Sequence, residues 1–395
     1  MSVTRAAKWT VATWAAAALV ACGSSSSGTG APPPDASTGG SAAGGASGSG
    51  GAGSGGGPAG GSVGSGGTST GGSSANGGAS AGGASSGGGG PGGESGDLAS
   101  QYPGDVGIAS DPDVIWAEDF EEDSVATLLA RYDDSKPDGL SLDADVPAKS
   151  SGKASGKLTA NGAGPNAVDF FKRLPDVDEL WVRYYAKYEA NVPWHHTGVW
   201  IGGYNPPTSY PNPQAGLKPN GDDRFAVSLE PMEQNTAAPR MDTYDYWMTM
   251  HSWMDVPSGD TAYYGNAVIH DPTFTAKDTW QCFEVHIKLN PDPASALGAE
   301  LGAWLDDRTL AAFTDSAPLG YWVKDKFCMD AAVGTECTDY RPANPTLVPL
   351  DLQYRNTSAL RLNYFWPQNY ITDAGGGSVH YDDMVLAKRR IGCIR

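Results

Sequence analysis

The sequence predicts an all-β domain over residues 97–395, a two-sheet antiparallel β-sandwich of the jelly-roll type. Three observations lead to this prediction. Apolar residues recur at every second position in short runs, as they do in strands with one buried face. Turns rich in Pro, Gly, Asn and Asp separate the runs. No stretch shows a helical period over ten or more residues, so helices are not expected to build the core.

The alternation is clearest in the segment 180–188 and recurs in 224–230, 283–290, 300–306 and 379–385. In the first segment, one face carries Leu180, Val182, Tyr184, Ala186 and Tyr188, and the other carries Trp181, Arg183, Tyr185 and Lys187. The first set is the more apolar and is expected to be buried. Tyr184 and Tyr188 would then need hydrogen-bond partners inside the core.

Residues 1–22 are expected to form a secretory signal peptide that ends at a lipid attachment site. Arg5 and Lys8 flank the start of an apolar run that is too short to span a membrane. The end of the run, Leu19-Val20-Ala21-Cys22, resembles the lipobox of bacterial lipoproteins, which implies that Cys22 carries the lipid. An ordinary cleaved signal with an incidental cysteine is the alternative. Because Gly23 and not Asp follows, we expect an outer-membrane anchor in the cell envelope, with the domain exposed at the surface.

Residues 23–96 consist almost entirely of Gly, Ser, Ala and Thr. This segment holds 32 of the 54 glycines, and its charged residues are Asp35 and Glu94. Such a chain has too few apolar side chains to offset the entropy lost on ordering. We therefore expect a disordered tether with an r.m.s. span of roughly 45–50 Å.

The net charge of −19 argues against several classes of partner. No cluster of Lys and Arg offsets it, so nucleic acid and anionic lipid are not expected partners. Membrane contact is expected through the lipid anchor alone, and the domain is expected to be a monomer.

Four cysteines remain after Cys22, namely Cys282, Cys328, Cys337 and Cys393. An exported chain with four cysteines is expected to form two disulfides, for which three connectivities are possible. The short segment between Cys328 and Cys337 favours a local pair, which leaves Cys282 to pair with Cys393. The spacing of CxxC zinc sites is absent.

Several strand motifs resemble those of bacterial concanavalin A-like jelly rolls. The segments 280–290 and 301–307 are similar to the paired strands W-x-x-x-E-V-H-x-K-L-N and W-x-D-G, although Asp307 replaces the usual glycine. The opening segment 116–121 and the closing segment 381–392 resemble the ends of the same group. This group includes jelly-roll polysaccharide lyases, so the resemblance implies a polysaccharide or cell-surface glycan as partner.

A lyase that acts by β-elimination on a uronate needs a cation beside the carboxylate, and Tyr or His to move protons. The candidate catalytic residues are Arg183, Tyr185, Lys187 and His286. The candidate substrate-binding residues are Trp181, Arg361, Asn363, Tyr364, Trp366, Gln368 and Tyr370. We expect both sets to share one groove. The alternative is that they are ordinary polar residues on the solvated face of a sandwich.

Other chemistry is less favoured. A retaining glycosidase needs carboxylates at alternate positions of a strand in the cleft, and the closest match, 118–122, lies in the first strand. His195 and His196 are interpreted as part of a solvated loop. No cofactor is expected for catalysis. Asp119, Glu121, Asp382 and Asp383 would converge on a structural Ca²⁺ if the first and last strands pair, and ordinary surface carboxylates are the alternative.

Two functional hypotheses remain. The first is a carbohydrate-active lyase that cleaves a uronate-containing glycan by β-elimination. The second is a non-catalytic glycan-binding or adhesion lipoprotein on the same scaffold. A purely structural envelope lipoprotein would give the surplus Trp and Tyr no role. The negative charge opposes a polyanionic substrate unless the cleft is locally basic.

Overall fold

The structure is a computed structural model that describes residues 96–161, 166–190, 196–211, 215–232, 240–252, 263–269, 275–329, 337–338, 340–371 and 375–395. The expected signal peptide, Cys22 and residues 23–95 of the expected tether lie outside the described residues, as does His195. Within them, every helix is too short or too polar to cross a membrane.

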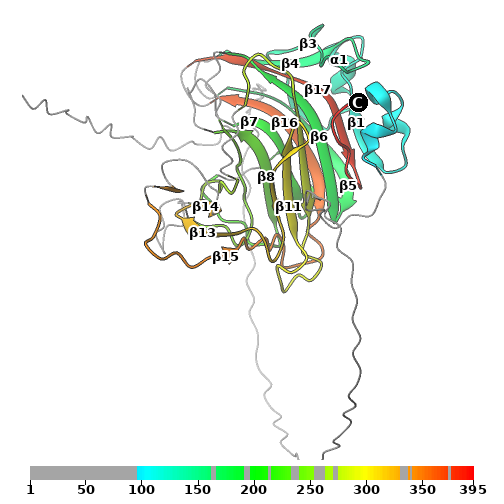
Figure 1. The fold of residues 1–395 in the computed structure, drawn as a ribbon. Helices are drawn as coiled ribbons and strands as arrows, with labels where there is room; N and C mark the ends of the chain where they lie inside the picture. Colours follow the sequence, from blue (N-terminus) through cyan, green and yellow to red (C-terminus); the bar gives the residue numbers. More distant parts are fainter. Residues whose placement is uncertain are drawn as a thin grey trace, which may run out of the picture. The chain divides into compact units, whose positions relative to one another are not determined.

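Two antiparallel sheets form a sandwich (Figure 1). Sheet A consists of β1 (Val114–Glu118), β3 (Leu140–Asp143), β4 (Ser155–Ala160), β6 (Glu179–Tyr188), β10 (Gln281–Lys288), β11 (Glu300–Leu305), β12 (Arg308–Phe313) and β17 (Gly377–Ala387). Its order is β12-β11-β10-β6-β17-β4-β3, with β1 also paired to β17. Sheet B consists of β2 (Asp134–Lys136), β5 (Asn166–Val177), β7 (Thr197–Tyr204), β8 (Arg224–Pro231), β9 (Met241–Thr243) and β16 (Leu362–Ile371). Its order is β2-β5-β16-β7-β8-β9.

A small third sheet joins β13 (Leu319–Val323), β14 (Lys326–Met329) and β15 (Val348–Pro349). The helical elements described are short: η1 (Leu98–Ser100), η2 (Pro103–Asp105), η3 (Ile108–Ser110) and α1 (Val125–Leu129). The predicted two-sheet antiparallel jelly roll is confirmed. The five alternating segments correspond to β6, β8, β10, β11 and β17.

The core lies between the two sheets and uses the face of β6 that the alternation predicts. The side chains from Leu180 to Tyr188 at even positions are buried. The Tyr184 hydroxyl donates to the carbonyl oxygen of Leu229 at 3.2 Å, and the Tyr188 hydroxyl donates to that of Thr197 at 3.3 Å. Both core phenols therefore have the partners that burial requires.

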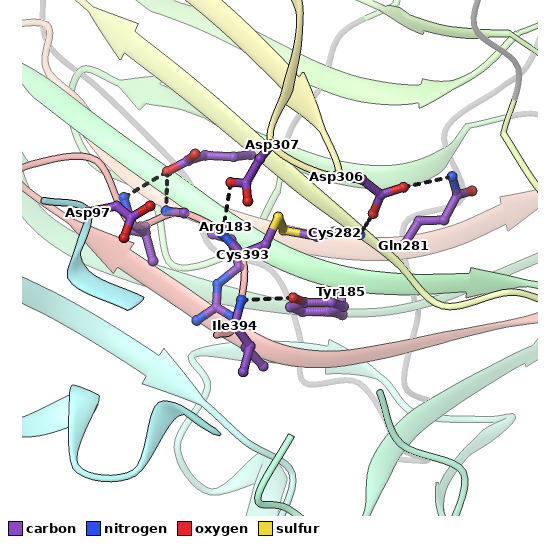
Figure 2. The surroundings of a disulfide bond; sticks show 12 residues. Asp97, Arg183, Tyr185, Gln281, Cys282, Asp306, Asp307, Cys393 and Ile394 are labelled. Carbon is purple, nitrogen blue, oxygen red and sulfur yellow. Dashed lines mark hydrogen bonds between the residues drawn. A yellow bond between two sulfur atoms is a disulfide. The ribbon is translucent and has the colours of Figure 1, made fainter. Parts of the chain in front are cut away.

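Both predicted disulfides are present. Cys282 in β10 is bonded to Cys393, with the Cα atoms 5.9 Å apart. Cys328 in β14 is bonded to Cys337, with the Cα atoms 5.6 Å apart. The first bond holds the C-terminal tail against the outer face of sheet A, the face that points away from sheet B (Figure 2).

The N-terminal segment 97–111 covers part of that same outer face. The Leu98 amide donates to the Arg390 carbonyl at 3.2 Å, and the Ala99 amide donates to the Ile391 carbonyl at 2.8 Å. Leu98 and Ile108 form a small apolar cluster with side chains of β17 and with Ile391. The two ends of the domain thus join over the outer side of β6 and β17.

Candidate functional site

The outer residues of β6 lie together, as the alternation predicts, but two of them are covered. Arg183 is fully buried and forms an ion pair with Asp105 of the N-terminal segment. Tyr185 is 8% exposed, and its hydroxyl accepts a hydrogen bond from the amide of Ile394 at 2.9 Å (Figure 2). Burial raises the pKa of Tyr185 to about 12. Neither side chain is placed to meet a polysaccharide.

The remaining outer candidates of sheet A are also paired with carboxylates. Lys187 forms an ion pair with Asp145. His286 in β10 lies 2.9 Å from Glu179, and its ring stacks on Trp181 with the centroids 4.0 Å apart. Because each candidate cation has a carboxylate partner, the described part of this face offers no unpaired candidate cation for the lyase hypothesis.

The prediction of one groove shared by the 181–187 set, His286 and residues 361–370 is wrong. The register pairs β6 with β10 and β17 in sheet A, whereas β16 pairs with β5 and β7 in sheet B. Alternation specifies which side chains share a face, and it does not specify which sheet a strand joins.

Two of the expected substrate-binding residues make structural contacts at the start of β16. Arg361 pairs with Asp178 at 2.5 Å. The amide of Asn363 donates to Asp176 and to the backbone of Tyr204. Both side chains join β16 to its neighbours.

The other four, Tyr364, Trp366, Gln368 and Tyr370, share the face of sheet B that points away from sheet A, here called the distal face. The orientation follows from Asn369, whose amide donates to the carbonyl of Leu158 in sheet A at 2.9 Å. Asn369 therefore points inward, and its even-numbered neighbours point outward.

Aromatic rings cover the middle of the distal face. Trp366 lies opposite Trp200 of β7, and their ring centroids are 6.0 Å apart. Tyr364 stacks on Tyr204 at 5.0 Å. Trp200 and Trp366 are 4% and 6% exposed, so these rings pack mainly against one another and form the base of the face.

The accessible polar part of the distal face surrounds His196, at the start of β7. We call it the His196 cluster; its members are His196, Glu230, Tyr244, Gln368 and Tyr370. Nδ1 of His196 lies 3.0 Å from Oε1 of Glu230, and the Ser228 hydroxyl donates to the other oxygen of Glu230 at 3.1 Å. Glu230 is 1% exposed and the His196 side chain 14%, so the carboxylate is held rigidly behind a reachable imidazole.

Two phenols flank the imidazole of His196. The ring centroid of Tyr244 lies 4.6 Å from it, and that of Tyr370 lies 6.0 Å from it in a stacked arrangement. The Gln368 amide donates to the His196 carbonyl at 3.0 Å and fixes the backbone there. Burial raises the pKa of Tyr370 and holds that of Tyr244 well above its usual range. Both phenols therefore stay protonated at neutral pH.

His196 is a residue that the sequence reasoning missed. For His196 the solvated-loop interpretation is wrong, because its ring pairs with Glu230 on the distal face, and its φ is positive at 60°. The strand period cannot predict the direction of a side chain in such a turn. The signal that was available is the polar pair Ser228 and Glu230 on the neighbouring strand.

A second polar row crosses the distal face toward β2. Gln368 lies opposite Asp169 of β5, which lies opposite Lys136 of β2. Burial raises the pKa of Asp169, whose carboxylate is 3.5 Å from the Lys136 ammonium. The Lys136 side chain is 60% exposed and is a cation within this row that a ligand can reach.

A separate acidic cavity of about 180 Å³ lies where β1 meets β17. Asp105, Asp119, Glu121 and Asp383 line it. One buried oxygen each of Asp105 and Asp383 has no hydrogen-bond partner among the described residues. Burial raises the pKa of Asp383 to about 6. Arg183 neutralises Asp105, and the remaining carboxylates of the cavity form a donor set that suits a hard cation such as Ca²⁺.

The predicted set of cation ligands is thus brought together in part. Asp382 is buried beside the cavity, and burial together with the charge of Asp383 raises its pKa to about 9. Among the described residues, the carboxylates whose ligand oxygens all lie within 4.8 Å of one another belong to Glu118, Asp119 and Glu122. Arg131 pairs with Glu118 at 3.0 Å and also with Glu122, which makes that group the weaker cation site.

Comparisons with known proteins identify structural likenesses only. No protein-family model and no curated protein matches the sequence. Solved structures with a similar fold include polysaccharide lyases. Alginate lyase Aly36B has a TM-score of 0.45 at 10% identity, and the match covers 71% of this chain and 99% of that one. The PL-14 alginate lyase from Aplysia kurodai has a TM-score of 0.44 at 12% identity, and the match covers 70% of this chain and 99% of that one. The endo-β-1,4-glucuronan lyase from Trichoderma reesei has a TM-score of 0.39 at 11% identity, and the match covers 70% of this chain and 96% of that one.

Proposed function

We propose that the domain binds a uronate-containing polysaccharide on the distal face of sheet B and cleaves it there by β-elimination. The observation that carries the proposal is the His196–Glu230 pair, a reachable imidazole backed by a buried carboxylate and flanked by two protonated phenols. A proton acceptor and a proton donor thereby lie side by side on an aromatic surface, which is what the reaction needs.

Each group has a definite role in the proposed reaction. His196, oriented by Glu230, takes the proton from the carbon next to the uronate carboxylate. The electrons of that C–H bond form the new C=C bond, and the C–O bond to the leaving sugar breaks. Tyr370, the more accessible phenol, gives its proton to the departing oxygen. Proton transfer from His196 back to Tyr370 through solvent restores both groups.

The substrate carboxylate must be stabilised as negative charge builds on it. Lys136 is the reachable cation of the row that contains Asp169 and Gln368, and Gln368 lies opposite Gly198 of β7, the strand that His196 precedes. Because Asp169 offsets the charge of Lys136, this row carries no net positive charge. A sparsely charged glycan, with neutral sugars between the uronates, fits such a face better than a uniform polyanion does.

Two further proposals concern a stabilising cation and the attachment of the chain to the cell envelope. We propose that the cavity lined by Asp105, Asp119, Glu121 and Asp383 holds a structural Ca²⁺, which would neutralise these carboxylates and link β1 to β17. We also propose that the chain is anchored through Cys22 in the cell envelope, with residues 23–96 as a spacer.

Ultraviolet absorbance at 235 nm tests the lyase proposal, because β-elimination creates a conjugated unsaturated uronate. The full-length protein is incubated with a panel of alginate, glucuronan, pectate and mixed neutral–uronate glycans. Unsaturated product that disappears in His196→Gln and in Tyr370→Phe supports the proposal. His286→Gln is the matched control, because His286 also has a carboxylate partner and an aromatic neighbour but lies on sheet A. A panel without unsaturated product overturns the lyase, and retained binding that is lost in Trp366→Ala would establish a glycan-binding domain.

A further inference from the structure

A second cavity, of about 500 Å³, opens on the outer face of sheet A. Asp143, Asp145, Lys157, Lys187, Glu189 and His380 line most of it. It is separate from the His196 cluster, which lies on the other sheet, and from the acidic cavity at β1. The volume is sufficient for one or two sugar rings.

The floor of this cavity is one row of the sheet. His380 of β17 lies opposite Lys157 of β4 on one side and opposite Lys187 of β6 on the other. Residues in register on neighbouring strands are about 4.8 Å apart, so three nitrogen-bearing side chains project in parallel from the sheet. Such a row spans about 10 Å across the three strands.

Each ammonium of the row has a carboxylate beside it. Lys157 lies 2.8 Å from Glu189, with the two side chains 28% and 35% exposed. Lys187 pairs with Asp145, with the side chains 15% and 42% exposed. These groups are within reach of solvent, and each pair presents a hydrogen-bond donor next to an acceptor. Two neighbouring hydroxyls of a sugar present the complementary pattern, because each hydroxyl both donates and accepts.

The charge of the cavity excludes an acidic ligand. Asp143 and Asp278 add two carboxylates to the two ion pairs, so negative groups outnumber the lysines. Repulsion would therefore weaken the binding of a uronate here. An uncharged ligand that hydrogen-bonds to both signs of charge is the better fit.

Two more observations point to a bound sugar. His380 is 3% exposed, and its Nδ1 has no hydrogen-bond partner among the described residues. The Trp280 indole N–H donates to Asp145 at 2.8 Å, and its ring lies beside His380 with the centroids 6.0 Å apart. A buried nitrogen without a partner costs free energy that a ligand hydroxyl would recover. The Trp280 hydrogen bond also holds Asp145 in position beside Lys187, so that this donor–acceptor pair is preorganised.

We propose that this cavity is a second glycan site, which binds an uncharged hexopyranose of a neutral polysaccharide. It does not depend on the proposed lyase activity, because the two sites lie on different sheets. The domain would then hold one glycan on sheet A while sheet B acts on another, which places the reaction next to a neutral polymer.

Isothermal titration calorimetry on the full-length protein tests the proposal. The probes are cellohexaose, laminarihexaose and mannohexaose, with a galacturonate oligomer as the charged comparison. We expect at least one neutral probe to bind and the charged probe not to bind at this cavity. Lys187→Met and His380→Gln should each weaken the neutral probe about tenfold, the equivalent of one lost hydrogen bond to a charged or buried group.

Two controls and one substitute variant make the result decisive. His286→Gln, on the same sheet but outside the cavity, should leave the affinity unchanged. Trp366→Ala on the distal face of sheet B should also leave the affinity for the neutral probe unchanged. This control distinguishes failure of the second-site proposal from failure of the lyase proposal. Should His380→Gln unfold, Asp143→Asn at the rim provides a milder variant. Binding by none of the neutral probes, or equal weakening in His286→Gln, overturns the second site.

Discussion

Nδ1 of His196 lies 3.0 Å from Oε1 of Glu230, although the two residues are 34 positions apart in the chain. The Ser228 hydroxyl holds the other carboxylate oxygen. The imidazole is thereby oriented by a buried carboxylate, an arrangement that makes histidine an effective general base.

We expect Glu230→Gln to lower kcat/KM for β-elimination by about 10²-fold, because the amide no longer stabilises the protonated imidazole of His196. The rate is measured as absorbance at 235 nm. Glu179→Gln removes the equivalent partner of His286 and should leave the rate unchanged. Equal rates for wild type and Glu230→Gln would contradict the assignment of His196 as the base.

Calcium is expected to stabilise the domain through the acidic cavity at β1. At a concentration near 100 times the dissociation constant, a ligand that binds the folded state alone adds about 2.7 kcal/mol, or a rise in Tm of about 5 °C. Differential scanning fluorimetry measures the shift. Asp383→Asn should abolish it, and Mg²⁺ at equal concentration should not reproduce it. An unchanged Tm in calcium would rule out the site.

The two disulfides should differ in their contribution to stability. The chain-entropy model gives about 4.8 kcal/mol for Cys282–Cys393 and about 2.6 kcal/mol for Cys328–Cys337, because the sequence separations are 111 and 9. Paired Cys→Ser variants, compared by urea unfolding, check the order. The reverse order would show that the C-terminal tail is held mainly by its other contacts.

The carboxylate of Asp178 should make stability depend on acid pH. Hydrogen bonds and charges from Arg355 and Arg361 outweigh its partial burial and lower its pKa. Because the pKa of Asp178 is lower in the folded state, its ionised carboxylate stabilises the fold fully above the ordinary pKa near 3.8. This stabilisation is lost as the pH falls through the lowered pKa of the folded state. At pH 7, Asp178→Asn should cost about 1–2 kcal/mol, since the side chain is 46% exposed and partly screened. The difference should vanish in acid, while Asp138→Asn, in an exposed loop, should show none at either pH.

Cys22→Ala should release the protein from the membrane fraction, because one lipid-bearing cysteine is the anchor that we propose. Fractionation of cells followed by immunoblotting measures the distribution. A variant that still sediments with membranes after washing in high salt would contradict the anchor.

The acidic group at the two ends of the domain illustrates how much of a site a family resemblance can predict. Asp119, Glu121 and Asp383 line one cavity because β1 pairs with β17, as the resemblance implied. Asp105, which also lines the cavity, comes from a short helical turn that carries no recognisable signal. Ligands supplied by irregular segments are therefore the part of such a site that sequence patterns miss.

By itself, the sequence predicted five of the strands, the buried face of β6 and two disulfides, and it favoured the pairing that the structure shows. Period-two alternation is a local property, so the inward Tyr184 and the outward Arg183 of β6 follow from neighbouring residues alone. The tertiary structure decided which faces are available. Arg183 is covered by Asp105, 78 residues earlier in the chain, and Trp366 joins the other sheet. Both outcomes depend on long-range strand pairing and on how the ends of the chain pack, and a residue's immediate neighbours do not encode them.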